Sequence, residues 1–217
     1  MNASVSDFLE TGNIMIIPLF QDTVKAPNNT TVGLSRSASI TLKSAISSDS
    51  FGGKEEEIIS IWTKQCQIIL LGMGENSNLD TKKSRDIGAK CFSNLSENKG
   101  KNTVIRFTTG WNTENMASFA EGMILRDYTF DKYQKKINDK KQDSEWKIVC
   151  QTTKRLRKNL DLEIKKLSSI ATGVHLARDL GNEPANRLYP EEFGRRAKDW
   201  AKGKENVEVE VWDFSRL

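Results

Sequence analysis

Hydrophobic and polar positions along the chain follow two periods, one typical of strands and one typical of helices. Short apolar runs bounded by polar or glycine-containing segments predict strands at residues 14–20, 58–62, 67–73, 102–109 and 145–151. Apolar positions that recur every three or four residues predict helices at residues 37–47, 80–95, 112–128 and 156–180. This alternation predicts an α/β layered domain with a central sheet over residues 1–150.

The same periods predict which side chains face the core. The expected inward positions are Ile40, Ala45 and Ile46, then Leu79, Ile87, Cys91 and Leu95, then Met116, Phe119, Met123 and Ile124, and finally Leu160, Ile164, Leu167, Ala171 and Val174. Asn78 or Asp80 is expected to cap the second helix. Pro18 cannot donate a ladder hydrogen bond, so the first strand is expected to lie at a sheet edge or to carry a bulge.

The C-terminal part of the sequence predicts a connector followed by the start of something larger. Gly181 and Pro184 should end the long helix near Asn182, and the polar side chains of Asn182, Glu183 and Asn186 are expected to bond the exposed backbone ends. Pro190 is predicted to open a short helix, and residues 206–214 alternate as a half-buried strand should. One helix and one strand bury too little surface for a domain. The predicted organisation is therefore residues 1–150 as one domain, 151–182 as a connecting helix and 183–217 as the first elements of a second α/β domain.

Composition narrows the class of protein. Hydrophobic residues make up 37% of the 217-residue chain and charged residues 29%, as in soluble globular proteins. The N-terminal sequence has no basic segment followed by an apolar stretch, and every apolar run is much shorter than the roughly 20 residues that span a bilayer. The three cysteines are widely spaced and odd in number, which favours buried reduced thiols over disulfides. A cytoplasmic protein without a membrane partner is the prediction.

Charge and motif searches give only weak candidates for chemistry. The glycine turn at residues 72–76 follows a predicted strand and could cradle a phosphate, but it lacks the full spacing of a dinucleotide or P-loop motif, which favours an ordinary turn. The acidic run Glu55–Glu57 is interpreted as a solvated lead-in to a strand rather than a metal site. His175, the one histidine of the chain, is expected to pack rather than to catalyse. No catalytic, cofactor-binding or metal-binding residue is assigned.

Basic residues gather at 132–141 and 153–158, within a net charge of +4. Such a region, 132–158, could attract nucleic acid. Acidic residues are interleaved, and no aromatic residues are spaced among the basic ones to stack on bases, so a solvated surface is the favoured interpretation. Nucleic-acid binding remains an alternative.

Two blocks of the sequence resemble the leucyl aminopeptidase (cytosol aminopeptidase) family. The stretch "GVHLARDLGNEPANRLYPEEF", residues 173–193, is similar to the family's A-R-[DE]-L-x-N-x-P-x-N-x-x-x-P pattern. The positions that match it are Ala177, Arg178, Asp179, Leu180, Asn182, Pro184, Asn186 and Pro190. Upstream, "FAEGMILRDYTFDKYQKK", residues 119–136, resembles the family's A-E-G helix and the aromatic segment after it, and "QIILLGMGE" resembles its strand and glycine turn.

The resemblance implies a macrodomain-like, three-layer N-terminal domain with a central mixed sheet. The family's complete enzyme is a metallopeptidase, a hydrolase that removes N-terminal amino acids from peptides with two divalent cations, zinc or manganese. The resemblance implies that these cations are held by the blocks G-K-G-x-T-F-D-S-G-G and N-T-D-A-E-G-R-L, and neither block occurs here. We therefore expect no cofactor in this chain, no activity by itself, and a role as a scaffold and oligomerisation module, since the family assembles as a hexamer. The alternatives are nucleotide or ADP-ribose binding at Gly72–Gly74, and nucleic-acid binding.

Overall fold

The structure is a computed structural model of the chain, and it describes residues 2–6, 14–24, 34–47, 51–64, 66–95, 102–134 and 147–216. The chain divides into two compact units, Met1–Gly173 and Val174–Leu217. The division falls inside one long helix, α4 (Lys154–Asn182). The segment boundaries at residues 150 and 182 that the sequence suggests remain predictions.

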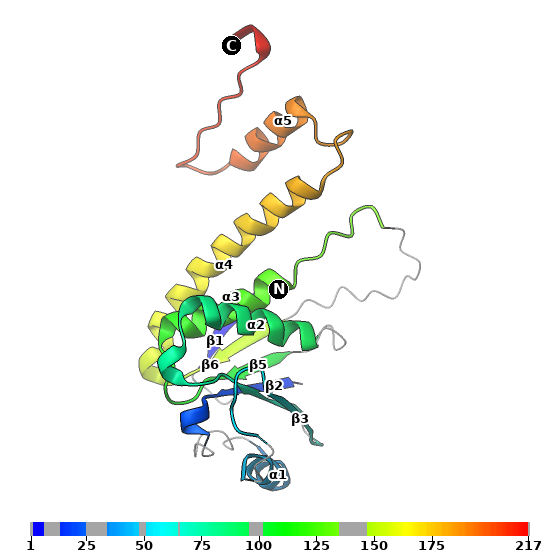
Figure 1. Cartoon of the computed structure of the whole chain (residues 1–217). Coiled ribbons are helices and arrows are strands. Elements are labelled where there is room, and N and C mark those ends of the chain that lie inside the picture. Colours follow the sequence, from blue (N-terminus) through cyan, green and yellow to red (C-terminus); the bar gives the residue numbers. More distant parts are fainter. Residues whose placement is uncertain are drawn as a thin grey trace. The chain divides into compact units, whose positions relative to one another are not determined.

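The larger unit is built around a mixed sheet (Figure 1). The strands are β1 (Asn2–Ser6), β2 (Ile14–Leu19), β3 (Ile58–Trp62), β4 (Gln67–Gly72), β5 (Thr103–Arg106) and β6 (Lys147–Gln151). Their order across the sheet is β1-β6-β5-β2-β4-β3. All neighbouring pairs are parallel except β3 and β4, which form an antiparallel pair. The predicted α/β class with a central mixed sheet is confirmed.

Helices cover both faces of this sheet and give three layers (Figure 1). On one face lie α2 (Thr81–Leu95), α3 (Thr113–Arg126) and the first turns of α4. On the other face lies α1 (Arg36–Ser47). Strand β2 feeds both cores, because Ile14 and Ile16 point to the α2–α3 side while Met15 and Ile17 point to the α1 side. Its run of buried residues is thus typical of a strand covered on both faces.

Pro18 corrects the expectation of an edge strand or a bulge. Strand β2 is central, between β5 and β4. The pairing with β5 ends at Ile16 and Ile105, so the proline lies just beyond it. The Ile14 N–H donates toward the β5 side, to Asn102 O, and alternate residues of a strand face the same side. The missing N–H of Pro18 therefore points where no ladder bond is needed, and its carbonyl accepts a hydrogen bond from Thr108 Oγ1 at 3.4 Å.

Two further expectations on the larger unit need correction. Ile40 was expected to face the core, but it is 60% exposed, and α1 instead buries Ala38, Leu42 and Ile46 at intervals of four residues. Strand β1 was not expected, because its sequence is mostly polar. Its weak alternation of half-buried Ala3 and Val5 with exposed Ser4 fits an edge strand, which among the described strands pairs only with β6.

The smaller unit contains α5 (Pro190–Ala201), which opens at Pro190 as predicted. Helix α4 ends at Asn182, also as predicted. The strand expected at residues 206–214 is wrong: residues 207–213 have no regular structure, and a short 3-10 turn follows at Phe214–Arg216. A strand needs a hydrogen-bonded neighbour, and the described part of this unit offers none.

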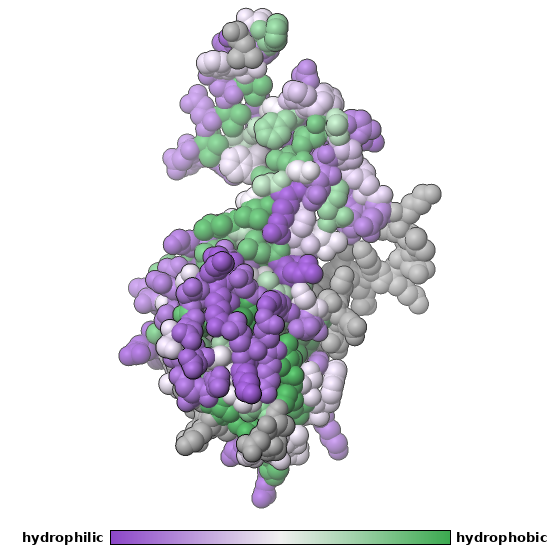
Figure 2. All heavy atoms as spheres, in the orientation of Figure 1, coloured by the Kyte–Doolittle hydropathy of each residue, from purple (hydrophilic) through white to green (hydrophobic). Residues whose placement is uncertain are grey.

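The surface of the molecule carries both polar and apolar patches. In the view of Figure 2, hydrophilic side chains cover most of the visible face of the larger unit. The smaller unit exposes large hydrophobic side chains, namely Leu176, Tyr189, Phe193, Trp200, Val211, Trp212 and Phe214. Among the described residues, no helix is at once long and apolar enough to cross a membrane.

Candidate functional site

The glycine turn after β4 was the first candidate for a binding site. Its N–H groups would have to be free to hold a phosphate. The three N–H groups of residues 72–74 are already bonded inside the protein: Gly72 N donates to Glu57 O at 2.7 Å, Met73 N to Leu19 O at 3.0 Å and Gly74 N to Gly53 O at 3.0 Å. The geometry therefore favours an ordinary strand-to-helix turn over a phosphate cradle.

Packing explains why glycines occupy this turn. A Cβ on Gly72 would lie 1.9 Å from the carbonyl oxygen of Lys54, closer than any real contact. Gly74 has a φ of +70°, which residues with side chains rarely adopt. The turn thus lets two loops approach each other closely, and both glycines have a structural reason.

The acidic run Glu55–Glu57 was interpreted as a solvated lead-in, and the structure adds a set of contacts to that description. Glu55 pairs with Lys83 of α2 at 2.8 Å, and Glu56 pairs with Lys90 of the same helix. Glu57 turns inward on its own loop, where a carboxylate oxygen accepts the Lys54 N–H at 3.0 Å. The Gly52 N–H donates to the same carboxylate. The run therefore joins the loop before β3 to α2.

The residues that the structure describes do not form a site for the pair of divalent cations that the family resemblance implies for the complete enzyme. Metal sites of this kind need several carboxylate, histidine or cysteine side chains around one point. Over the described ranges, no group of three or more such side chains comes together. The carboxylates of the run just described point to lysines and to backbone N–H groups instead.

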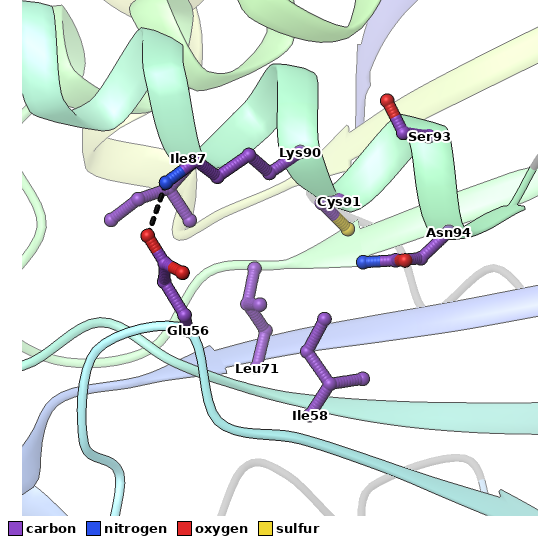
Figure 3. Close-up of a pocket in the computed structure, with 8 residues that line it drawn as sticks. All are labelled: Glu56, Ile58, Leu71, Ile87, Lys90, Cys91, Ser93 and Asn94. Carbon is purple, nitrogen blue, oxygen red and sulfur yellow. Dashed lines mark hydrogen bonds and ion pairs between the residues drawn. The ribbon is translucent and has the colours of Figure 1, made fainter.

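A cavity of about 260 Å³ lies between α2 and the strands β3 and β4 (Figure 3). Its lining includes the apolar side chains of Ile58, Leu71 and Ile87, and the Glu56–Lys90 ion pair lies beside it. Cys91 also lines it, but burial raises the pKa of this thiol to about 12. A thiol that stays protonated is a poor nucleophile, so Cys91 is not activated for covalent chemistry in this cavity.

A second cavity, of about 230 Å³, lies at the carboxyl ends of β5 and β6. It is lined by Phe107, Thr108, Thr109, Gly110, Trp111, Met116, Thr152, Thr153, Arg155 and Leu156. Among the described residues of that lining, Arg155 is the one ionisable side chain, and an arginine stays protonated in proteins. The cavity therefore offers no pair of groups for acid–base catalysis.

The A-E-G motif, which the family resemblance singled out, lies at the crossing of α2 and α3. Glu121 is buried, and it accepts a hydrogen bond from Arg85 Nε at 2.6 Å. A Cβ on Gly122 would lie 2.0 Å from the Arg85 carbonyl, and one on Gly88 would lie 2.2 Å from the Phe119 carbonyl. The motif thus allows two helices to touch backbone to backbone and adds an ion pair across the contact.

The segment after α4 is held by charges within the smaller unit. Glu183, whose side chain is only 2% exposed, pairs with Arg196 of α5 at 3.0 Å. The Glu183 side chain thus contacts α5, and the expectation that it bonds the exposed backbone ends stays a prediction. Arg196 also donates to Glu192, which accepts two further bonds from Arg195. These bonds fix how the chain passes from the end of α4 into α5. The single histidine, His175, lies half-buried on α4.

Sequence reasoning did not find the lysines and the arginine that face these carboxylates. Lys83, Arg85 and Lys90 lie 28 to 36 residues from their partners along the chain. Local spacing cannot connect residues that far apart. Two signals were available in the sequence. Lys83, Arg85 and Lys90 all lie within one predicted helix, and Glu121 stands beside Gly122 among apolar residues of the next helix.

Comparison with known proteins shows to which family this chain belongs. The family model described as "Cytosol aminopeptidase family, N-terminal domain" matches residues 16–137, more than half of the chain. The chain belongs to the cytosol aminopeptidase family. The matched region contains most of β2, all of β3 to β5, α1 to α3 and the A-E-G motif.

Curated relatives agree with this assignment, and a solved structure shares the fold. A "Probable cytosol aminopeptidase" of Clostridium perfringens is 28% identical over 213 residues, which cover 94% of this chain and 41% of the relative. One of Sinorhizobium fredii is 36% identical over 151 residues, covering 67% and 29%. The chain thus spans less than half the length of these relatives. A mutant of tomato leucine aminopeptidase shares the fold with a TM-score of 0.75 and 19% identity, covering 100% of this chain and 45% of that structure.

Proposed function

We propose that this chain is a non-catalytic scaffold and assembly portion of a leucyl aminopeptidase-type metallopeptidase. In this proposal the complete protein removes N-terminal amino acids from peptides with two divalent cations held outside residues 1–217. The chain itself supplies a rigid three-layer domain, a connecting helix and the entry to the peptidase domain. A cytoplasmic location and a homo-oligomeric state belong to the same proposal.

The membership in the cytosol aminopeptidase family is the observation that carries this proposal. It is supported by the short share of the relatives that the chain spans, 41% and 29%, which leaves most of a peptidase beyond the matched region. The absence of the two metal-ligand blocks from the sequence supports the same division of labour. The bonds that hold α5 to the end of α4 support a role in setting the path of the chain into the next domain.

The two alternative functions receive less support. Binding of a nucleotide or ADP-ribose at Gly72–Gly74 is disfavoured because the N–H groups of that turn are already bonded to protein carbonyls. Nucleic-acid binding through residues 132–158 involves residues 135–146, which lie outside the described ranges. The basic side chains within 153–158 lie on the first turns of α4 and are exposed on an ordinary helix surface. Leu156, between them, is half-buried.

A chimera tests the proposed scaffold role. The stretch of the Clostridium perfringens relative that aligns with this chain is replaced by residues 1–217, and the parent and the chimera are compared by light scattering and by hydrolysis of leucine p-nitroanilide. We expect the chimera to have the parent's oligomeric mass and to hydrolyse the substrate, whereas the relative without that stretch does neither. A folded chimera with a different mass would contradict the assembly role.

A further inference from the structure

The parallel strands of the sheet change their direction of addition between β2 and β5. Along the chain β2 is followed by β4 on one side, and the chain then returns past β2 to place β5 and β6 on the other side. Helix α1 covers one face, whereas α2 and α3 cover the other (Figure 1). In sheets of this kind ligands bind in the crevice outside the carboxyl ends of the two strands. The topology therefore favours a binding position at the ends of β2 and β5.

The second cavity described above lies beside this position. Its volume is about 230 Å³, and its lining comes mainly from residues 107–111 after β5 and from residues within 152–156 after β6. Thr108 Oγ1 donates to the carbonyl of Pro18 at 3.4 Å, which ties the first of these segments to the end of β2. Sites for drug-sized ligands measure roughly 300–1,000 Å³. This cavity therefore has room for one small chemical group.

The polar groups of the lining favour a negatively charged group. Arg155 makes no ion pair with any described residue, and the hydroxyl groups of Thr109, Thr152 and Thr153 have no partner among the described residues either. The described lining contains no aspartate or glutamate. A cavity with an arginine and hydroxyl donors but without a carboxylate suits an oxyanion and repels a cation.

A buried donor without an acceptor is a second, independent observation. Trp111 lines the cavity and is 6% exposed, and its indole Nε1 has no hydrogen-bond partner in the described part of the chain. Its ring centroid lies 5.3 Å from that of Phe20, 4.8 Å from that of Phe107 and 6.0 Å from that of Phe119, and these rings offer no acceptor. A buried indole N–H usually has a partner. An oxygen atom of a ligand in the cavity would supply it.

Helix α4 adds the positive end of its dipole. Its first turn contributes Arg155 and Leu156 to the lining. The first N–H groups of a helix have no acceptor within the helix. Leu156 N and Arg157 N donate to the carbonyl of Thr153, but the N–H groups of Lys154 and Arg155 have no acceptor among the described residues. Helix ends of this kind bind oxyanions.

We propose that this cavity binds a phosphate group, held by the Arg155 guanidinium, the first N–H groups of α4 and the indole N–H of Trp111. Phosphate is chosen over a carboxylate because its three or more oxygens accept bonds from several directions, and these donors come from two separate segments. The group can belong to inorganic phosphate or to a phosphate ester, whose organic part lies outside the cavity. The inference does not rest on the scaffold role, and none of the lining residues belongs to the glycine turn at residues 72–76.

Nitrogen–proton correlation NMR of the full chain tests the contact with Trp111. The chain has five tryptophans, and the Trp111 indole signal is assigned by its loss in Trp111→Phe. At constant pH we expect sodium phosphate to move this signal to lower field in a saturable manner, because the N–H gains an acceptor. The signal of exposed Trp62 on β3 should stay in place. Sodium acetate at the same ionic strength should move neither. An equal shift with acetate would overturn the proposal.

Calorimetry with AMP, inorganic phosphate and adenosine identifies the source of the group. Tighter binding of AMP than of inorganic phosphate would show that the site takes a phosphate ester, and the reverse order would show that it takes the free ion. Adenosine lacks the phosphate and should not bind. If adenosine bound as tightly as AMP, or if neither phosphate compound bound, the proposal would be overturned.

Two charge variants distinguish the cavity from a general attraction to a basic helix. Arg155→Gln removes the cation of the lining and should weaken phosphate binding about tenfold or more. Lys158→Gln removes an exposed cation of the same helix that is not in the lining, and it should leave the affinity nearly unchanged. Both side chains are exposed, so both variants should fold, and circular dichroism checks this. Equal weakening by the two substitutions would contradict the site, while the chimera would still test the scaffold role.

Discussion

Gly88 and Gly122 lie where α2 and α3 cross, and neither position has room for a side chain. We expect Gly122→Ala and Gly88→Ala each to lower the free energy of unfolding by about 1–3 kcal/mol, because the new methyl group pushes against a backbone carbonyl. Urea unfolding followed by circular dichroism measures the change.

Gly173 provides the matched control for these two variants. It is also a helix-interior glycine, but a Cβ there would meet nothing within 4 Å. Gly173→Ala should therefore be neutral or stabilising, by up to about 1 kcal/mol, since alanine is the better helix former. If all three substitutions changed the free energy of unfolding equally, the close helix contact would not be the reason for the A-E-G motif.

The three cysteines should be chemically silent in the folded chain. Burial raises the pKa of Cys91 and of Cys150 to about 12, and it also raises the pKa of Cys66. The reactive thiolate is therefore scarce at pH 8. We expect an aromatic disulfide reagent to label none of the three within the time in which it labels all of them in denaturant. Rapid labelling of the native chain would show that a cysteine is accessible and ionised.

Glu192 is expected to titrate far below its usual range. Hydrogen bonds from Arg195, and then from Arg196, lower its pKa from 4.5 to about 2. Because the folded-state pKa is depressed, the stabilisation is present above pH 4.5 and is lost as the pH falls toward 2. NMR titration of the Glu192 carboxyl carbon should give this low midpoint in the unmodified chain.

Arg195→Gln should raise the Glu192 midpoint toward 4.5, since it removes the largest cause of the shift. Lys198→Gln changes a charge on the same helix without touching that network, and it should leave the midpoint where it is. A midpoint unaffected by Arg195→Gln would mean that the charge network around Glu192 does not form in solution.

At the scale of single elements, the start of α2 separates two candidate caps. Asp80 accepts a hydrogen bond from Lys83 N at 2.7 Å, as an N-cap side chain should. Asn78 instead donates to Glu75 in the preceding turn. Asp80→Ala should cost about 1 kcal/mol in the free energy of unfolding, and Asn78→Ala clearly less, as measured by urea unfolding. Equal costs would contradict Asp80 as the cap.

The sequence predicted most elements because their cores obey a simple period. The stripes of α2, α3 and α4 were found since residues such as Ile87, Phe119 and Ile164 recur every three or four positions and are all buried. Ile40 misled the prediction for α1, because a β-branched apolar residue there is exposed while small Ala38 is buried. The strand expected at 206–214 failed for a different reason: alternation is necessary for a strand, but pairing comes from another segment.

The candidate site was less predictable than the fold. The ion pairs Glu55–Lys83 and Glu56–Lys90 connect the loop before β3 to α2, beside the cavity that β3 and α2 line. These contacts depend on tertiary structure, which spacing along the chain does not encode. The glycine turn could be seen in the sequence, but not the three carbonyls that use its N–H groups. The resemblance to the aminopeptidase family came from the blocks at 119–136 and 173–193, and the structure gives the first of these a packing role in the A-E-G helix.

At the scale of the whole molecule, the chain has two units. The larger is a three-layer unit with a hydrophobic core on each face of its sheet, and the smaller exposes many apolar side chains. Ion pairs such as Glu183–Arg196 hold the described part of the smaller unit. Its helix α5 contributes little to a hydrophobic core, because Gly194 is the one buried residue of that helix. Among the described residues no cluster of side chains that could hold a metal ion is present. In the function proposed above, this chain has a structural role and peptide cleavage belongs to the rest of the protein.

One measurement tests this central claim most directly. The purified chain is incubated with leucine p-nitroanilide and added manganese or zinc, beside a complete cytosol aminopeptidase as the positive control, and release of p-nitroaniline is followed. We predict a rate equal to the blank at every metal concentration. Metal-dependent turnover that co-elutes with the chain, and that a chelator abolishes, would contradict the claim.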